Sequence, residues 1–161
     1  MPRDLAVPGM TPAAFRFWRS TMGYTQVQAA EALGMSEPRV EEMEAGVKKG
    51  KGTPTSIPVV VAMACSALDA KIGPYAWDKK LGAMPPAAFT RWRGEMGRKR
   101  GVDGPLELKA VAELLALASV DTVLFWERGV RRDGKPAPIN RPQALALNAL
   151  LHGLGPWTRE R

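Results

Sequence analysis

The chain has 161 residues but only one cysteine, Cys65, and one histidine, His152. A single cysteine excludes an internal disulfide framework and suits a reducing compartment. So few thiol and imidazole groups also exclude most zinc sites and cysteine–histidine catalytic pairs. No apolar run reaches the roughly 18 to 20 residues that a membrane span needs. No apolar segment follows Met1-Pro2-Arg3-Asp4, so we expect neither a span nor a secretory signal.

Catalytic patterns are also missing. The sequence contains no phosphate-binding glycine loop, no nucleophile motif and no metal-ligand cluster, so we expect no enzyme, no cofactor and no metal. What is present is an apolar fraction of 45%, five tryptophans and a net charge of +7. This composition is typical of an ordered globular chain. The positive charge indicates a polyanionic partner, although charge alone says nothing of the fold.

The chain repeats itself. Residues 10–23 read MTPAAFRFWRSTMG and residues 84–97 read MPPAAFTRWRGEMG, so nine of fourteen positions are identical. Weaker matches continue through 57–74 and 139–156. The repeat therefore covers nearly the whole chain.

The repeat predicts two domains, residues 1–83 and 84–161. The spacing between matches grows along the chain, which indicates an insertion of about nine residues in the second copy. We expect it at residues 98–104, a basic and glycine-containing stretch. Most of the basic excess lies in this second copy.

Each copy has the signals of four to five short helices. Thr25 and Gln28 have the spacing of a capping box, and Gly34 follows as a helix end. Ser36 is expected to cap the next helix, which Gly46 ends. No strand pattern is evident, so we predict an all-α fold of two tandem helix-turn-helix domains. We expect Trp18, Trp92, Trp126 and Cys65 to pack in the core.

Residues 25–46 resemble the helix-turn-helix of the phage repressor, Cro and Xre family. The shared features are a threonine–glutamine start, a leucine–glycine turn, a capping serine and a glutamate-x-glycine end. They are carried by Thr25, Gln26, Leu33, Gly34, Ser36, Glu44 and Gly46. The second copy matches mainly at Ser119 and at residues 126–129, and Leu117-Ala118 stands in place of the glycine turn. Residues 119–129 are also similar to antitoxin-type and anti-CRISPR-associated regulators.

The resemblance implies that the third helix of each copy enters the major groove of DNA. It assigns base contacts to the following residues: Glu37, Pro38, Arg39, Glu42, Asp121 and Thr122. In the second copy, Val120 and Phe125 fill the remaining corresponding positions. The third helix of the first copy is acidic and repels phosphate, and we expect Glu41 and Glu44 on its solvent face.

Phosphate contacts must then come from the flanking residues. Gln26 matches the phosphate-contacting glutamine of the family, and Lys109 or Leu108 stands at this place in the second copy. In the first copy the expected phosphate contacts are Arg16, Arg19, Gln26, Ser36, Lys48, Lys49 and Lys51. In the second copy they are Arg98, Lys99, Arg100, Lys109, Arg128, Arg131 and Arg132.

The sequence therefore predicts a sequence-specific double-stranded DNA-binding regulator, a repressor of a bacterial or phage-like operon, in the cytoplasm at the nucleoid. Two arrangements stay open. Both copies of one chain contact DNA, which we favour, or one copy reads DNA and the other pairs with a second chain in a homodimer. The alternative function is a protein-interaction module, either an antitoxin or a regulator that docks on a polymerase or a phage protein.

Overall fold

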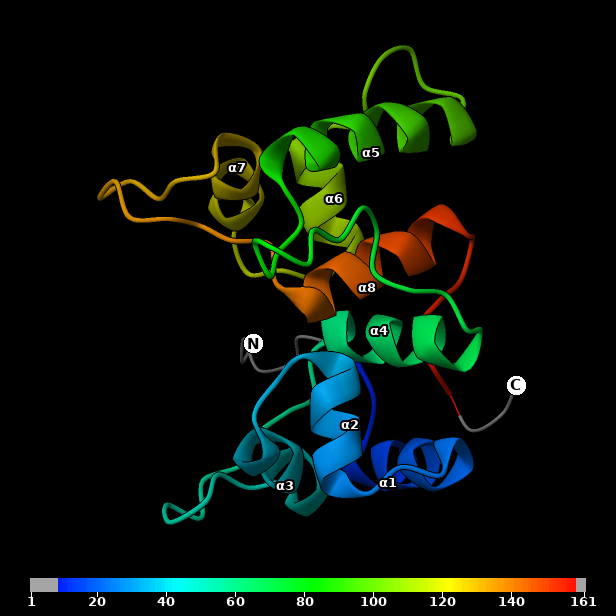
Figure 1. Ribbon diagram of the computed structural model, residues 1–161, viewed down its shortest axis with the longest axis vertical. Helices are drawn as coiled ribbons and strands as arrows, with labels where there is room; N and C mark the ends of the chain where they lie inside the picture. Colours follow the sequence, from blue (N-terminus) through cyan, green and yellow to red (C-terminus); the bar gives the residue numbers. More distant parts are fainter. Residues whose placement is uncertain (1–8, 159–161) are drawn as a thin grey trace, which may run out of the picture.

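The computed structural model describes residues 9–158 and contains eight helices in that range. The first half consists of α1 (Pro12–Met22), α2 (Gln26–Leu33), α3 (Glu37–Ala45) and α4 (Val59–Asp69). The second half consists of α5 (Pro86–Lys99), α6 (Leu108–Leu114), α7 (Val120–Arg128) and α8 (Arg141–Leu151). Between residues 9 and 158 extended segments meet only at isolated bridges, so the predicted all-α class is confirmed (Figure 1).

Two expectations concern membranes and targeting. None of the eight helices combines the length and the apolar character that crossing a membrane requires. The segment on which the expectation about a secretory signal rests, residues 1–4, lies outside the described residues.

Helices α2 and α3 begin and end at the predicted capping residues. The Gln28 backbone N–H donates to the Thr25 hydroxyl (3.1 Å), and the Thr25 N–H donates to the Gln28 side chain (2.9 Å), which completes the capping box. Gly34 ends α2 with a φ of 76°, and Ser36 then caps α3. These contacts satisfy backbone groups that a helix end would otherwise leave unpaired. The α2–turn–α3 unit is therefore set by local sequence.

The second half differs from the first at two places. Helix α5 continues past Gly97, the counterpart of Gly23, so the inserted residues form its last turn and a loop that returns over Gly97. A Cβ at Gly97 would lie 2.1 Å from the Gly104 carbonyl oxygen, so the close return requires glycine. The expected replacement of the glycine turn by Leu117-Ala118 is wrong. Ala116 takes the left-handed conformation, with a φ of 52°.

The two halves pack against each other through α4 and α8. These helices lie side by side in the middle of the molecule, with α1–α3 on one side and α5–α7 on the other (Figure 1). The segment after each helix contacts the opposite half. The Tyr75 N–H donates to the Ala144 carbonyl and the Trp157 N–H donates to the Ala62 carbonyl, both at 3.1 Å. Trp157 lies 82 positions after Tyr75, and Ala144 lies 82 positions after Ala62, so the two bonds join equivalent residues of the two halves.

Two hydrogen bonds from side chains to backbone carbonyls are reciprocal in the same way. The Ser66 hydroxyl donates to the Gly155 carbonyl (2.6 Å), and the Asn148 amide donates to the Gly73 carbonyl (2.8 Å). Because each contact recurs with the halves exchanged, the halves are related by an approximate two-fold axis between α4 and α8.

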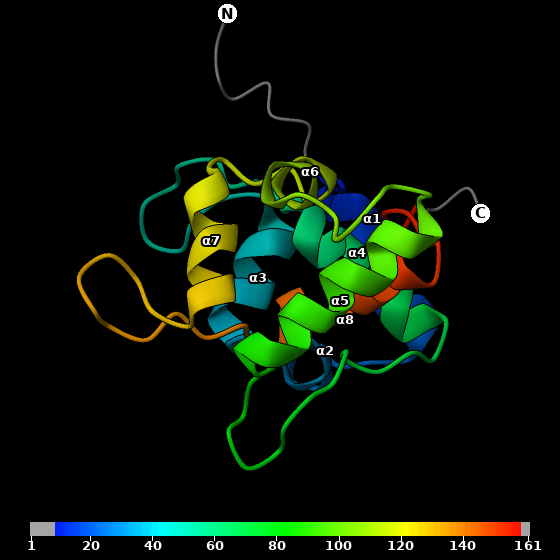
Figure 2. The same cartoon turned by 90° about the horizontal axis from the view of Figure 1, so that it is seen from above.

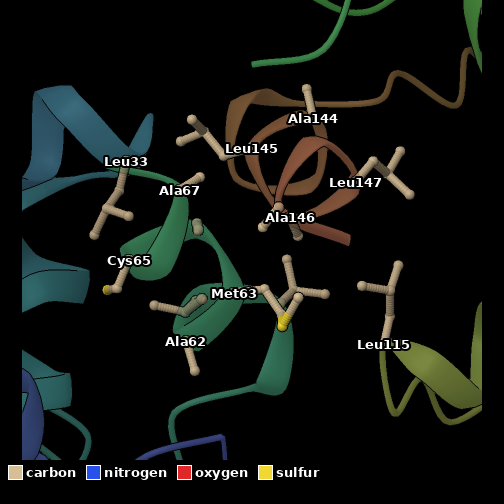
Figure 3. Close-up of a cluster of buried hydrophobic side chains, with 14 of the residues drawn as sticks. Leu33, Ala62, Met63, Cys65, Ala67, Leu115, Ala144, Leu145, Ala146 and Leu147 are labelled. Carbon is tan, nitrogen blue, oxygen red and sulfur yellow. The ribbon is translucent and has the colours of Figure 1, made fainter. Parts of the chain in front are cut away.

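Buried apolar side chains from both halves form one cluster. Figure 3 shows its centre, where side chains of α4 and α8 meet Leu33 and Leu115 at the ends of α2 and α6. Trp18 and Trp92 are fully buried, and their indole N–H groups donate to the carbonyls of Cys65 (3.1 Å) and Leu147 (2.7 Å). The tryptophans and Cys65 therefore lie in the core, as expected. The division into two domains, residues 1–83 and 84–161, stays a prediction.

Candidate nucleic-acid interface

The third helices of both halves, α3 and α7, lie on the same side of the molecule. Each is followed by a narrow loop that extends beyond it on that side (Figures 1 and 2). We call residues 46–55 the first hairpin and residues 129–137 the second hairpin. The first is closed by a bridge between Val47 and Pro54, and the second by a bridge between Val130 and Pro136. The two-fold arrangement therefore presents two helices and two basic hairpins together.

A buried carboxylate holds α3 against α1 and α2. The Glu44 side chain forms an ion pair with Arg19 and accepts a hydrogen bond from the Gln26 amide (3.2 Å). The Arg16 guanidinium donates to the Glu44 backbone carbonyl. Glu44 is only 7% exposed, so its expected place on the solvent face is wrong. Arg16, Arg19 and Gln26 have these partners within the protein, and their contact with phosphate stays a prediction.

The second half has the same network with one donor missing. Glu127, the counterpart of Glu44, accepts from the Thr90 hydroxyl (2.9 Å) and pairs with Arg93 (3.1 Å) through its Oε1. Its Oε2 is buried and has no hydrogen-bond partner within residues 9–158. Leu108 stands where the first half has Gln26, so no side-chain amide reaches this oxygen. Lys109 is the exposed neighbour of Leu108 on α6 and does not take the glutamine's place.

The outer face of α3 is partly neutralised by its own hairpin. The Arg39 guanidinium donates to the Thr55 hydroxyl (3.1 Å) and lies 3.8 Å from the Glu42 carboxylate. Lys49 forms an ion pair with Glu41, and this hydrogen bond and its charge raise the pKa of Lys49. The Lys49 backbone N–H donates to Glu42 (3.2 Å). Two of the acidic side chains of α3 therefore already face cations.

The start of α3 is free of such contacts. Glu37 and Pro38 are exposed, and no hydrogen bond or ion pair within residues 9–158 uses the Glu37 carboxylate. The Ser36 hydroxyl oxygen accepts a hydrogen bond from the Arg39 backbone N–H (3.3 Å) and so caps the helix. The predicted base contacts Glu37 and Pro38 are thus accessible, whereas Arg39 and Glu42 are held by other groups of the protein.

The outer face of α7 has a different character. Val120 is 42% exposed, and Thr122 is exposed beside it. Asp121 pairs with Arg132 of the second hairpin (3.3 Å). A hollow of about 280 Å³ lies between α7 and this hairpin, and Phe125 forms part of its wall. The predicted base contact Thr122 is accessible, and Asp121 faces a cation.

The second hairpin has its own charge pattern at the tip. Arg131 pairs with Asp133 (3.0 Å), and the pKa of Asp133 is lowered first by the Lys135 backbone N–H and then by Arg131. Lys135 is exposed here, and its side chain forms no ion pair within the described residues. The hairpin therefore keeps its cationic side chains at the surface.

Apart from Lys109, which is exposed on α6, the predicted phosphate contacts fall into three groups. Those at the face formed by α3, α7 and the hairpins are Ser36, Lys48, Lys49, Lys51, Arg128, Arg131 and Arg132. Those in or beside the Glu44 network are Arg16, Arg19 and Gln26. Arg98, Lys99 and Arg100 lie at the C-terminal end of α5, on the opposite side of the molecule from the hairpins (Figures 1 and 2).

Sequence reasoning missed the residues that hold the two third helices in place. Thr55 and Thr90 gave no signal, because a hydroxyl in a loop or on an exposed helix face is common. Arg93 could have been found, since it repeats Arg19 at the same spacing as the tryptophans. The chain matches no protein-family model, and it matches none of the curated proteins or solved structures with which it was compared.

Proposed function

We propose that the protein is a sequence-specific double-stranded DNA-binding regulator that inserts α3 and α7 into major grooves. The observation that carries this proposal is the placement of both third helices and both basic hairpins on one side of the molecule (Figures 1 and 2). The major groove is about 12 Å wide and admits an α-helix. Two helix-turn-helix units commonly read half-sites one helical turn, about 34 Å, apart.

The charge distribution supports this orientation. The repulsion expected from an acidic α3 is reduced because Arg39 lies beside Glu42 and Lys49 pairs with Glu41. The exposed cations of the two hairpins would supply the phosphate contacts. Phosphate contacts supply most of the sequence-independent affinity, while exposed side chains of the helices select bases.

Two variants with equal charge loss test the interface. The triple variant Arg131→Gln, Arg132→Gln, Lys135→Gln removes three cations from the second hairpin. The control Arg98→Gln, Lys99→Gln, Arg100→Gln removes three cations from the far side. Each phosphate contact contributes about 0.9 to the slope of log affinity against log salt. We expect the hairpin variant to lower that slope by about 2 to 3 and the control to leave it nearly unchanged.

The duplex for this measurement comes from selection on random DNA with the full chain, followed by gel shift at several salt concentrations. Equal slopes for the two triple variants would refute this interface. Failure to select any duplex would refute the function. We further propose that binding represses transcription at the nucleoid, which a promoter–reporter fusion carrying the selected site tests.

A protein-interaction module is the second candidate. Its supporting observations are the hollow between α7 and the second hairpin, where half-buried Phe125 forms part of the wall, and the exposure of Val120 on α7 and Val130 in the hairpin. A partner protein recovered in stoichiometric amount by a chain that binds no duplex would favour this function over DNA binding.

A further inference from the structure

We propose that one chain occupies a complete DNA site made of two inverted half-sites with different sequences, a cytosine facing Glu37 and a thymine facing Val120. This inference rests on the proposed DNA-binding function and adds the kind of site that is bound. It follows from the two-fold packing of the halves and from the chemistry of two equivalent residues.

The two-fold relation is built within the chain. Helices α4 and α8 bury their apolar faces against each other, and the bonds of Tyr75 and Trp157 tie each half to the other. In a dimer of identical subunits, this pairing would come from a second copy. Here α3 and α7 already form the pair, so a single chain presents two reading helices in inverted orientation.

Glu37 and Val120 are equivalent positions in the two halves. Each is the first residue of its third helix and follows a capping serine, Ser36 or Ser119. Both side chains are exposed, at the starts of the two helices that the hairpins follow. The symmetry therefore places a carboxylate in one half where the other half has an apolar side chain.

These two side chains suit different bases. In the major groove a carboxylate accepts a hydrogen bond from the cytosine N4 amino group. An apolar side chain instead contacts the C5 methyl group of thymine, and the methyl group of exposed Thr122 adds to that surface. A palindromic sequence would match only one of the two helices, so the preferred site is inverted in geometry and unequal in sequence.

The experiment begins with selection on random duplex DNA and native mass spectrometry of the complex, where we expect one chain per duplex. The half-site whose selected bases change with Val120→Ser is assigned to α7. Deoxyuracil then replaces thymine in each half-site separately, which removes only the methyl group. Loss of one buried methyl contact corresponds to about fourfold weaker binding.

We expect this loss in the α7 half-site only, with the α3 half-site as the matched control. In the Val120→Ser variant, the difference in affinity between thymine and deoxyuracil sites should become smaller, because the Thr122 methyl contact remains. Glu37→Gln should shift the preferred base at the other half-site from cytosine to adenine, because glutamine pairs with adenine N6 and N7. Both substitutions are at exposed positions, so folding is expected to be unaffected.

The outcomes separate the inference from the function beneath it. Absence of any selected duplex would overturn the DNA-binding function itself. Two chains per duplex, two identical half-sites, or equal affinity for thymine and deoxyuracil would overturn this inference while DNA binding stands.

Discussion

Glu44 and Glu127 occupy equivalent positions near the ends of α3 and α7, yet in the described part of the chain only Glu44 has donors for both carboxylate oxygens. Arg19 and Gln26 together satisfy Glu44. In the second half Thr90 and Arg93 share one oxygen of Glu127, and the other is buried with no partner among the described residues, 9–158. An unsatisfied buried polar atom costs about 1–3 kcal/mol, so the second network is the weaker one.

Supplying the missing donor should stabilise the protein. Leu108→Gln recreates the Gln26 arrangement, and we expect the free energy of unfolding to rise by about 1 kcal/mol, the net value of a hydrogen bond. The measurement is urea denaturation followed by circular dichroism. The reverse change, Gln26→Leu, is the matched control and should lower the free energy by a similar amount. Leu108 is partly buried against the core, so a loss of stability in Leu108→Gln would show that the lost apolar packing outweighs the new hydrogen bond.

The turn between α6 and α7 gives a second prediction. Ala116 has a φ of 52°, a conformation that costs a residue with a Cβ about 1–2 kcal/mol. Part of this cost is offset because glycine loses more backbone entropy on folding. Ala116→Gly should therefore raise the free energy of unfolding by about 0.5 kcal/mol. Thermal unfolding of the variant and the wild type measures it.

Its counterpart, Gly34→Ala, serves as the comparison and should be clearly destabilising. There a Cβ would lie 2.5 Å from the Arg141 Cβ, in addition to the unfavourable φ. A stabilising Gly34→Ala would contradict this account of the two turns.

Packing between α4 and α8 predicts that the halves depend on each other. Because the core spans both, residues 1–83 and 84–161 expressed separately should each lose helix content. Mixed in equal amounts, they should regain it. Circular dichroism of the mixture, compared with the sum of the separate spectra, measures the gain. A spectrum equal to that sum, with full helicity in each half, would show two independent domains.

The reactivity of the single cysteine, Cys65, measures how well this shared core is closed to solvent. Cys65 is fully buried, and burial raises the pKa of its thiol well above the ordinary value. A thiol-specific reagent at pH 8 should therefore react only when the protein opens, and its rate should increase steeply with denaturant. Rapid reaction in the native state would contradict this burial.

The same burial makes stability depend on pH. The folded state favours the neutral thiol, so this stabilisation is complete below the unfolded pKa of about 8.5 and decreases as the pH rises above it. Urea titrations across this range should show a smaller decrease for Cys65→Ala, which lacks the titrating group. An identical decrease in both proteins would rule out this contribution.

Much of the fold was predictable because its signals are local. Thr25, Gly34, Ser36 and Gly46 determine where helices begin and end through bonds to neighbouring backbone groups. The burial of Glu44 was not predictable in this way, because a glutamate on a helix is expected at the surface. It became favourable only through Arg19, which lies 25 positions earlier in the chain.

In the candidate interface, too, some features were predictable from the sequence and others depend on long-range contacts. The resemblance placed Glu37, Pro38 and Thr122 at accessible positions of α3 and α7, where the structure has them. It could not show that Arg39 is held by Thr55, since that contact depends on the path of the first hairpin. Nor could it show that residues 98–100 lie far from the hairpins, because the direction of α5 relative to α7 arises from long-range packing.

Because the two halves belong to one chain, their association does not depend on the protein concentration. Two separate subunits associate less as their concentration falls, whereas segments of one chain meet at an effective concentration set by the connection between them. The turn that joins the halves, closed by a bridge between Asp78 and Ala83, keeps α4 and α8 within reach at any protein concentration. Any ligand that touches both α3 and α7 therefore meets them already assembled, even when only a few molecules of the protein are present.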